Sequence, residues 1–478
     1  MSSQKCYTIR WKDRAIELRA AAMTNRDWSS LCGVMREHGL TRVNGGGRMT
    51  DDGLKHLGKL KDQITRLDLD GCPQLSDDGL KQLANFPKLR HLDIGGSKGI
   101  LTDRGLEVLA ELQELRQFQI CWQQKISDKG LAHLKHSERL ERVNLMGTPS
   151  GNGAVKTLTG KTALTHLTTG TRVTDAGLKH LHQFPVFKQW QNRERKYGLM
   201  GAGCEPNQLV LDGPFTDQGL ASLAGLDGLF GLSFFWHCPK FTSAGLAILS
   251  RLANLGAVGC QDAHCDDVAL GHIAAVPNLR MLMAQGAVAT EVGFAALAKS
   301  KTLEYVWGRD WLNFGNRGFL AFAKMRSLKG LAVSLRNVDN RTVSKLPSFP
   351  ALRELTPMDV SDEAFLPVGQ CAQLEKLWCM YCRQTGDVAT GHLKGLTKLK
   401  SYYAGATQIS DKSLKILARM KSLEHLEFRQ CLQITDSGAA HLARLPRLRE
   451  IEFGGDPGIS REACETIFPA RVAVTHWP

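Results

Sequence analysis

Residues 67–80 read Leu-Asp-Leu-Asp-Gly-Cys-Pro-Gln-Leu-Ser-Asp-Asp-Gly-Leu, and this pattern decides the fold because it recurs along most of the chain. Its second half, a Ser or Thr followed by Asp, returns at intervals of about 25 residues through much of the sequence. The pair begins at Thr50, Ser76, Thr102, Ser127, Thr174, Thr216, Ser410 and Thr435. A fixed period of 20–29 residues rich in leucine predicts one structural unit stacked many times along the chain.

The repeat that begins at Thr50 shows what one unit contains. Leu54, Leu57 and Leu60 recur at helical spacing, so they form the buried stripe of a short helix. Thr50 stands where a helix N-cap is expected, and an acidic residue in the first turn suits the helix dipole. Leucines then alternate with polar residues around Leu67, as a half-buried strand requires. Each unit is therefore one helix and one short strand, and stacked units pair their strands into a parallel sheet.

The strand position can be followed from repeat to repeat. Its first inward-facing residue occurs seventeen times between Val43 and Ile451, which predicts about 17 strands within residues 40–458. Residues 1–39 are expected to form an N-terminal helical cap, with residues 11–38 helical, and residues 459–478 a C-terminal cap with a final strand or edge cover. Solenoid ends need such covers because an open strand edge promotes aggregation.

One interval is longer than the others. The strand positions Leu167 and Leu209 lie 42 residues apart in the sequence, which indicates an irregular insertion near 191–207. Residues 184–190 resemble the start of a normal strand before it. Insertions in repeat proteins fall on loops and often mark a working face, although a surface loop without a role fits the same pattern.

The motifs at 67–80, at 236–246 (Trp-His-Cys-Pro-Lys-Phe-Thr-Ser-Ala-Gly-Leu) and at 428–438 resemble leucine-rich repeats of the cysteine-containing type. Such repeats are best known from F-box substrate-recognition proteins, and many bacterial proteins carry similar ones. The resemblance covers about residues 40–470. It implies an α/β leucine-rich repeat solenoid, a horseshoe with a parallel concave sheet and convex helices. No F-box is apparent before residue 40, so a ubiquitin-ligase role is not implied.

Bulk composition narrows the class of protein. The chain has 478 residues, a net charge of +14 and 43% hydrophobic residues. No apolar run is long enough for a transmembrane helix, and the N-terminus lacks the apolar core of a signal peptide. We therefore expect a cytoplasmic protein without a membrane partner. The 13 cysteines are expected to be reduced.

Candidate binding residues come from the strand positions that face outward on the concave side. Large aromatic, Met and Arg side chains gather there in the middle and later repeats, and protein-binding hot spots are rich in these residue types. The predicted partner-binding residues are Phe235, Met283, Tyr305, Trp307, Arg309, Trp378, Met380 and Tyr403. The alternative is that some of these rings only pack on one another. The last repeats are acidic at Glu427, Glu450 and Glu452.

Much of the basic charge falls on predicted helices rather than on this surface. Examples are Lys55, Lys59, Lys61, Lys81, Lys156, Lys179, Lys394, Lys412 and Lys415. A nucleic-acid partner needs a continuous basic stripe, so it is not expected. The sequence lacks the common catalytic and nucleotide-binding motifs, so we expect no enzyme activity and no cofactor.

Two cysteine clusters have the composition of metal sites. Cys379 and Cys382 have a C-x-x-C spacing, and Cys260, His264 and Cys265 are close in sequence. The repeat register explains the first pair by packing, and no second ligand pair accompanies the other, so no metal is predicted. Cys72, Cys238, Cys382 and Cys431 lie at equivalent turns, too far apart for disulfides, and are expected to be unpaired and mostly buried.

The sequence therefore predicts a non-enzymatic scaffold that binds a protein or peptide partner on its concave face. The alternative is recognition of a carbohydrate or small ligand by the same aromatic residues. The oligomeric state and the identity of the partner are not predicted.

Overall fold

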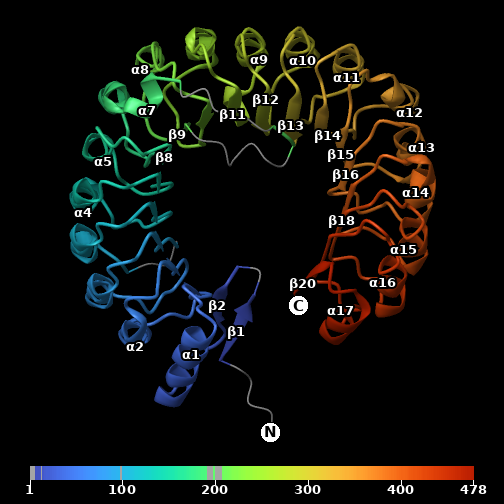
Figure 1. The fold of residues 1–478 in the computed structure, drawn as a ribbon. Coiled ribbons are helices and arrows are strands. Elements are labelled where there is room, and N and C mark those ends of the chain that lie inside the picture. Colours follow the sequence, from blue (N-terminus) through green and yellow to red (C-terminus); the bar gives the residue numbers. More distant parts are fainter. Residues whose placement is uncertain (1–5, 12, 97–99, 191–196, 200–206, 478) are drawn as a thin grey trace. The chain divides into compact units, whose positions relative to one another are not determined.

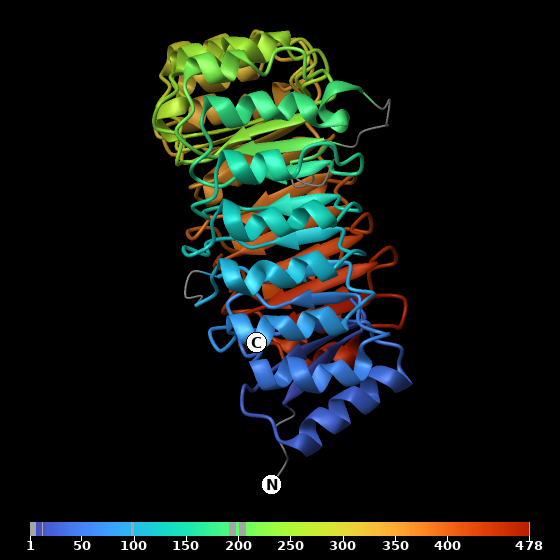
Figure 2. The same cartoon turned by 90° about the vertical axis from the view of Figure 1, so that its left-hand side faces the viewer.

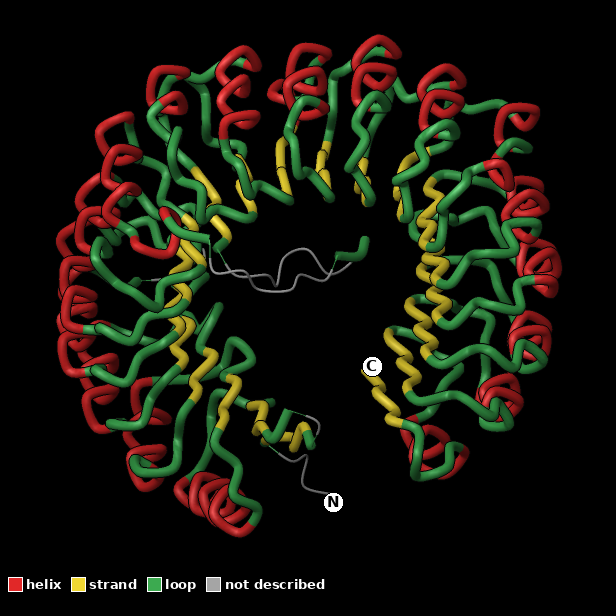
Figure 3. The backbone as a smooth tube through the Cα atoms, turned by 45° about the horizontal axis from the view of Figure 1, so that its top comes forward, coloured by secondary structure: helices red, strands yellow, loops and turns green. Residues whose placement is uncertain are grey.

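The computed structural model describes residues 6–11, 13–96, 100–190, 197–199 and 207–477. The chain forms two compact units: Met1–Glu194 with Glu205–Leu255, and Arg195–Cys204 with Gly256–Pro478. In each unit the strands lie on the inner, concave side of an arc and the helices on its outer side (Figure 1). The tube in Figure 3 shows the same two layers, with the strands in yellow and the helices in red.

The described residues of the first unit form ten strands. They are β1 (Tyr7–Arg10), β2 (Ala15–Leu18), β3 (Arg42–Asn44), β4 (Arg66–Asp68), β5 (His91–Asp93), β6 (Gln117–Gln119), β7 (Arg142–Asn144), β8 (His166–Thr168), β9 (Gln208–Leu211) and β10 (Gly231–Phe234). Strands β2 to β10 pair in chain order and in parallel, and β1 pairs with β2 antiparallel.

The helices of the first unit lie side by side, as Figure 2 shows. They are α1 (Asn25–Glu37), α2 (Asp51–Leu57), α3 (Asp77–Leu80), α4 (Asp128–Leu131), α5 (Asn152–Thr157), α6 (Asp175–His180), α7 (Pro185–Lys188) and α8 (Asp217–Ala221). Tighter 3-10 helices complete the outer layer: η1 (Gly58–Leu60), η2 (Lys81–Asn85), η3 (Asp103–Glu111), η4 (Ala132–His136), η5 (Leu181–Gln183) and η7 (Ser243–Arg251).

The strands of the second unit are β11 (Ala257–Gln261), β12 (Met281–Gln285), β13 (Tyr305–Arg309), β14 (Gly330–Ser334), β15 (Glu354–Met358), β16 (Lys376–Cys379), β17 (Ser401–Gly405), β18 (His425–Arg429), β19 (Glu450–Gly454) and β20 (Ala473–Trp477). Each pairs in parallel with the next.

The helices of the second unit are α9 (Asp267–Ala274), α10 (Glu291–Leu297), α11 (Asn316–Phe322), α12 (Asn340–Val343), α13 (Phe365–Gly369), α14 (Asp387–His392), α15 (Asp411–Leu417), α16 (Asp436–Leu442) and α17 (Arg461–Ile467). Its 3-10 helices are η8 (Asp262–His264), η9 (Leu346–Ser348), η10 (Asp362–Ala364) and η11 (Leu393–Gly395).

The core follows the repeat. All seventeen inward positions predicted between Val43 and Ile451 lie in strands, and each is exposed by 3% or less. The helices add a second apolar layer, for example Leu54, Leu57 and Leu60, which are buried against it. Because a single repeat cannot bury these leucines alone, the core forms only when neighbouring repeats stack.

The Ser/Thr-Asp pairs tie successive repeats together. Thr50 caps α2 as predicted, accepting a hydrogen bond from the Gly53 N–H. The following residue, Asp51, accepts hydrogen bonds from both the backbone and the hydroxyl of Ser76 in the next repeat. The same bonds join Asp77 to Thr102, Asp103 to Ser127, Asp175 to Thr216, Asp217 to Thr242, Asp267 to Thr290, Asp387 to Ser410, Asp411 to Thr435 and Asp436 to Ser460. We call this series the carboxylate ladder.

The ladder also explains the glycine of the repeat. An added Cβ at Gly130 would stand 2.6 Å from an Asp103 carboxylate oxygen, and one at Gly79 would overlap the Asp51 carboxylate. Each glycine thus leaves room for the Asp of the preceding repeat.

Two local expectations are wrong. Residues 11–38 were expected to be helical, but the chain forms the β1–β2 hairpin at the start of this range, and α1 is the only helix among the described residues of the cap. Ile16 and Leu18 are fully buried because β2 pairs with β3 and continues the sheet. Residues 184–190 were expected to start a strand, but Pro185 opens the short helix α7. Most of the insertion at 191–207 lies outside the described residues.

Candidate partner-binding surface

Strands β16 to β19 align their outward-facing side chains in rows. One row runs Trp378, Tyr403, Glu427 and Glu452, each in register with the next. A second row runs Lys376, Ser401, His425 and Glu450. Neighbours in a row are about one strand spacing apart, roughly 4.8 Å, so their side chains interact. This part of the sheet therefore presents one continuous surface of aromatic and charged groups.

The indole of Trp378 stacks on the phenol ring of Tyr403. The ring centroids are 4.9 Å apart and the planes differ by 24°. Burial raises the pKa of Tyr403 to about 12, and the nearby Glu427 carboxylate adds to that effect. The stacked pair is a rigid aromatic wall at the centre of the surface, because neither ring can turn without losing this contact.

On one side of this wall lies a hollow of about 300 Å³, here named the acidic hollow. Its charged lining consists of four carboxylates, Glu354, Glu427, Glu450 and Glu452, together with Lys376 and His425. The Lys376 Nζ is 2.9 Å from Glu354, and His425 Nδ1 is 3.6 Å from Glu450. Burial raises the pKa of Glu427, an effect that Arg429 opposes.

On the other side of Tyr403 lies a larger hollow of about 520 Å³, here named the aromatic hollow. Its side-chain walls are Met380, Tyr381, Arg383, Tyr403, Arg429 and Trp477. Arg429 bridges Glu427 at 2.5 Å and Glu452 at 2.8 Å, and its guanidinium lies 6.0 Å from the centre of the Trp477 ring. The two hollows are thus joined by one ion-pair network.

Tyr381 has an unusual backbone for an aromatic residue. Four residues after the first inward strand residue, most repeats turn through a left-handed conformation, usually at Gly or Asp. Gly occupies this position at Gly71, Gly96, Gly147, Gly213, Gly286 and Gly455. Tyr381 (φ +56°) and Trp122 (φ +64°) stand there instead. Bulky residues rarely adopt this conformation, and such strain gathers at functional sites. Tyr381 is 41% exposed, and Arg309 lies 5.3 Å from its ring centre.

Part of the insertion rests on β14 and β15. The backbone N–H of Leu199 donates to Glu354 Oε2 at 3.0 Å, and the Leu199 side chain is 4% exposed. A Cβ built on Gly330 would stand 2.5 Å from the Tyr305 ring and 2.9 Å from Leu199 Cγ, so both side chains lie against Gly330. Tyr305, predicted as a binding residue, is therefore buried, with an exposed fraction of 8%. Its predicted exposure is wrong because the insertion supplies a cover.

The other predicted residues fall into three groups. Trp378, Met380 and Tyr403 line the hollows, and Arg309 contacts Tyr381 at their edge. Met283 and Trp307 are partners in register on β12 and β13, with Met283 44% exposed. Phe235 belongs to the first unit, where its ring packs on Trp236 at 4.3 Å and lies 6.1 Å from Trp122.

Sequence reasoning missed three residues of this surface. Trp477 was not considered because the final strand was expected to end earlier, yet β20 aligns Trp477 with Gly454. Glu354 was missed because the insertion that contacts it could not be placed. Tyr381 carried a signal that could have found it: an aromatic residue at the position where other repeats have Gly.

The cysteines agree with the packing interpretation. Cys72, Cys238, Cys382 and Cys431 are buried and form no disulfide with any described residue, as predicted. Burial raises the pKa of the Cys382 thiol to about 12, so it is not a reactive thiolate. Cys260 and Cys265, considered above as metal ligands, form a disulfide. The expectation that all cysteines are reduced is therefore wrong for this pair, which lies only five residues apart in the sequence. No cluster of three or more metal-ligating side chains occurs among the described residues.

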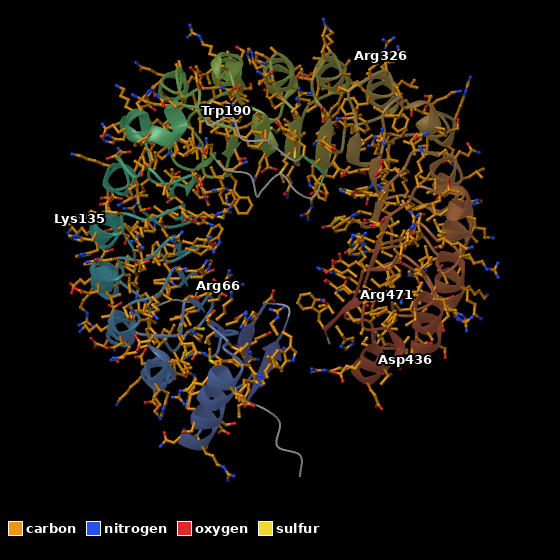
Figure 4. The ribbon with its side chains drawn as sticks, viewed as in Figure 1. Arg66, Lys135, Trp190, Arg326, Asp436 and Arg471 are labelled. Carbon is orange, nitrogen blue, oxygen red and sulfur yellow. A yellow bond between two sulfur atoms is a disulfide. The ribbon has the colours of Figure 1, made fainter. Side chains whose placement is uncertain are left out.

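The basic side chains examined from the sequence lie where they were predicted. Those at 55, 59, 61, 81, 156, 179, 394, 412 and 415 are exposed on or beside the outer helices. In Figure 4, Lys135 and Arg326 project from the helical side, whereas Arg66 lies on the strand side. Within the described part of the chain, no helix is long and apolar enough to cross a membrane.

Comparison with solved structures identifies the architecture. The structure of the TLR13–ssRNA13 complex matches with a TM-score of 0.51 and 16% identity, over 95% of this chain and 68% of that one. The fold is that of a leucine-rich repeat protein.

Other leucine-rich repeat structures match less closely in space. Yeast Rad7, from its complex with Elc1, has a TM-score of 0.34 and 14% identity over 95% of this chain and 88% of that chain. The leucine-rich repeat protein LIC12759 of Leptospira interrogans has a TM-score of 0.32 and 15% identity, over 88% of this chain and 91% of that chain. No family model matches the sequence. Comparison with curated proteins also gave no match.

Proposed function

We propose that this chain is a non-enzymatic interaction scaffold, which binds a protein or peptide segment on the concave surface of its second unit. The observation that carries the proposal is the pair of adjoining hollows on either side of Tyr403. Trp378, Tyr403 and Trp477 with Arg429 supply the side-chain types that dominate protein-binding hot spots. The paired strands beneath them hold these groups in place, which lowers the entropy cost of binding.

The test uses the full-length chain as bait. Proteins retained from a lysate are identified, and the purified partner is titrated against the wild type, Trp378→Ala and Tyr403→Ala by calorimetry. Each substitution should weaken binding by more than about 1 kcal/mol if the ring is an anchor. Trp236→Ala is the matched control, since Trp236 is 53% exposed but lies in the first unit. Unchanged affinity for both hollow variants would contradict the proposal.

A carbohydrate or small-ligand function is the second candidate. The aromatic hollow of about 520 Å³ favours it, because this volume lies within the usual range for such sites. The stacking of Trp378 on Tyr403 weighs against it, since two faces that a sugar could cover lie against each other. A glycan array probed with the intact chain distinguishes the two: specific hits lost in Trp477→Ala would favour this second function.

A further inference from the structure

We propose that the acidic hollow receives a basic side chain, Lys or Arg, of a peptide segment in the partner. This inference rests on the proposed function and adds the chemical class of the partner. The surface contrasts with the rest of the molecule, because the chain as a whole carries a net charge of +14. A basic segment would therefore be repelled by the net charge of the chain but attracted to this group of carboxylates.

The charges around the hollow do not balance internally. Of its four carboxylates, Glu354 is held by Lys376 and by the Leu199 N–H, whereas Glu427 and Glu452 share the single guanidinium of Arg429. Among the described residues of the lining, His425 is the only basic group besides Lys376. One further cation would balance the charge of a partly buried carboxylate pair, and such pairing is strongest where water is excluded.

The aromatic wall supplies an independent reason for the same occupant. Trp378 and Tyr403 line the hollow together with the carboxylates, and cations bind favourably over the faces of such rings. The protein already uses this chemistry beside the site. Arg429 contacts two carboxylates while lying 6.0 Å from the Trp477 ring centre, and Arg309 lies 5.3 Å from that of Tyr381.

The shape also favours a side chain over a larger basic surface. A hollow of about 300 Å³ admits one Lys or Arg with its aliphatic stem but no folded element. The adjoining aromatic hollow would take the next bulky residue of the same segment, on the far side of Tyr403. An anionic polymer such as RNA is disfavoured, because four carboxylates line the entry point.

The experiment selects binders from a random peptide library displayed on phage, with the full-length chain as target. Selected peptides are synthesised and titrated against the wild type and against the double variant Glu427→Gln/Glu450→Gln. Glu465→Gln is the matched control, because it also removes a carboxylate but from the exposed end of α17. Circular dichroism melting of each variant verifies folding.

We expect the selected peptides to contain Lys or Arg. Their affinity should fall at least fivefold in the double variant, remain unchanged in Glu465→Gln, and fall as the salt concentration rises. Replacing the basic residue of the peptide by norleucine should have the same effect as the double variant.

The outcomes separate the two proposals. Peptides that need Trp378 but contain no basic residue, or that bind the double variant normally, overturn this inference and leave the proposed function intact. A selection without any peptide that depends on Trp378 overturns both.

Discussion

Asp103 illustrates how single residues hold the solenoid together. It accepts a hydrogen bond from the Ser127 N–H at 2.7 Å and another from the Ser127 hydroxyl at 2.5 Å. Asn152 occupies the same position in another repeat, where its amide accepts from the Thr174 N–H and donates to the Thr174 hydroxyl. The side chain at this position must therefore accept a hydrogen bond from the backbone N–H of the next repeat. A negative charge on that side chain adds to the stability but is not required for the bond.

Asp103→Ala should destabilise the protein by about 1.5–3 kcal/mol, because hydrogen bonds to a charged acceptor contribute that much. Asp103→Asn should cost less than half as much, since Asn152 shows that an amide can make both bonds. Urea denaturation with hydrogen exchange at the Ser127 amide measures both effects. Equal losses in the two variants would show that the carboxylate itself is required.

At Asp387 the ladder should also weaken in acid. Burial alone would raise the pKa of Asp387, but hydrogen bonds from Ser413 and Ser410 outweigh it and hold the pKa below its usual range. Because the folded pKa is depressed, this stabilisation is fully present above about pH 4 and is lost as the pH falls through the folded value.

We therefore expect the Ser410 amide to lose exchange protection below about pH 4, after correction for intrinsic exchange rates. Asp387→Asn serves as the control, because its amide does not titrate. The same pH dependence in that variant would assign the effect to another group.

At the scale of elements, the segment at 197–199 changes what the concave sheet can present. It covers Tyr305 while leaving the hollows beyond Glu354 open. Burial raises the pKa of Tyr305 to about 12, in agreement with a ring that solvent hardly reaches.

Leu199→Ala should expose Tyr305, because the Leu199 side chain is the part of this segment that contacts the ring region. Nitration by tetranitromethane followed by peptide mass spectrometry should then modify Tyr305 several times faster than in the wild type. The solvent-exposed Tyr381 provides the internal control in the same digest. An unchanged ratio of nitration at the two residues would show that other groups cover Tyr305.

The sequence was most informative about elements that obey the repeat. The seventeen inward positions and the helix stripes were predictable because each depends only on local periodicity. The β1–β2 hairpin was not, since Leu18 fits a helical stripe with Ala15 as well as an alternating strand with Ile16, and pairing with β3 decided between them. Trp378 and Tyr403 were found from their strand register, whereas Trp477 and the cover over Tyr305 depend on contacts between distant segments.

At the scale of the whole molecule, many exposed lysines lie on the outer helices and away from the proposed binding surface. Lysines such as Lys412 and Lys415 are exposed on the helix α15, whereas the acidic hollow lies on the strand side. Retention on a polyanion should therefore depend on the helices.

The double variant Lys412→Glu/Lys415→Glu should elute from immobilised heparin at lower salt than the wild type, because it exchanges two positive charges for negative ones. Trp378→Ala should elute with the wild type. If Trp378→Ala eluted early as well, the polyanion would be contacting the concave surface, and a nucleic-acid partner would need to be reconsidered.

The carboxylate ladder also bears on how such a chain can change its length. Removing residues 77–102 would join Ser76 directly to Asp103, so Asp51 would still meet Ser76 and Asp103 would still meet Ser127. Each repeat of the ladder thus contributes one Asp acceptor and one Ser or Thr hydroxyl. If the chain is cut between the hydroxyl and the Asp that follows it, the rejoined chain still has one acceptor for each hydroxyl. Tandem duplication or loss of such a repeat therefore leaves no residue of the ladder without its partner, so the ladder does not oppose variation in the number of repeats where a partner requires a longer or shorter surface.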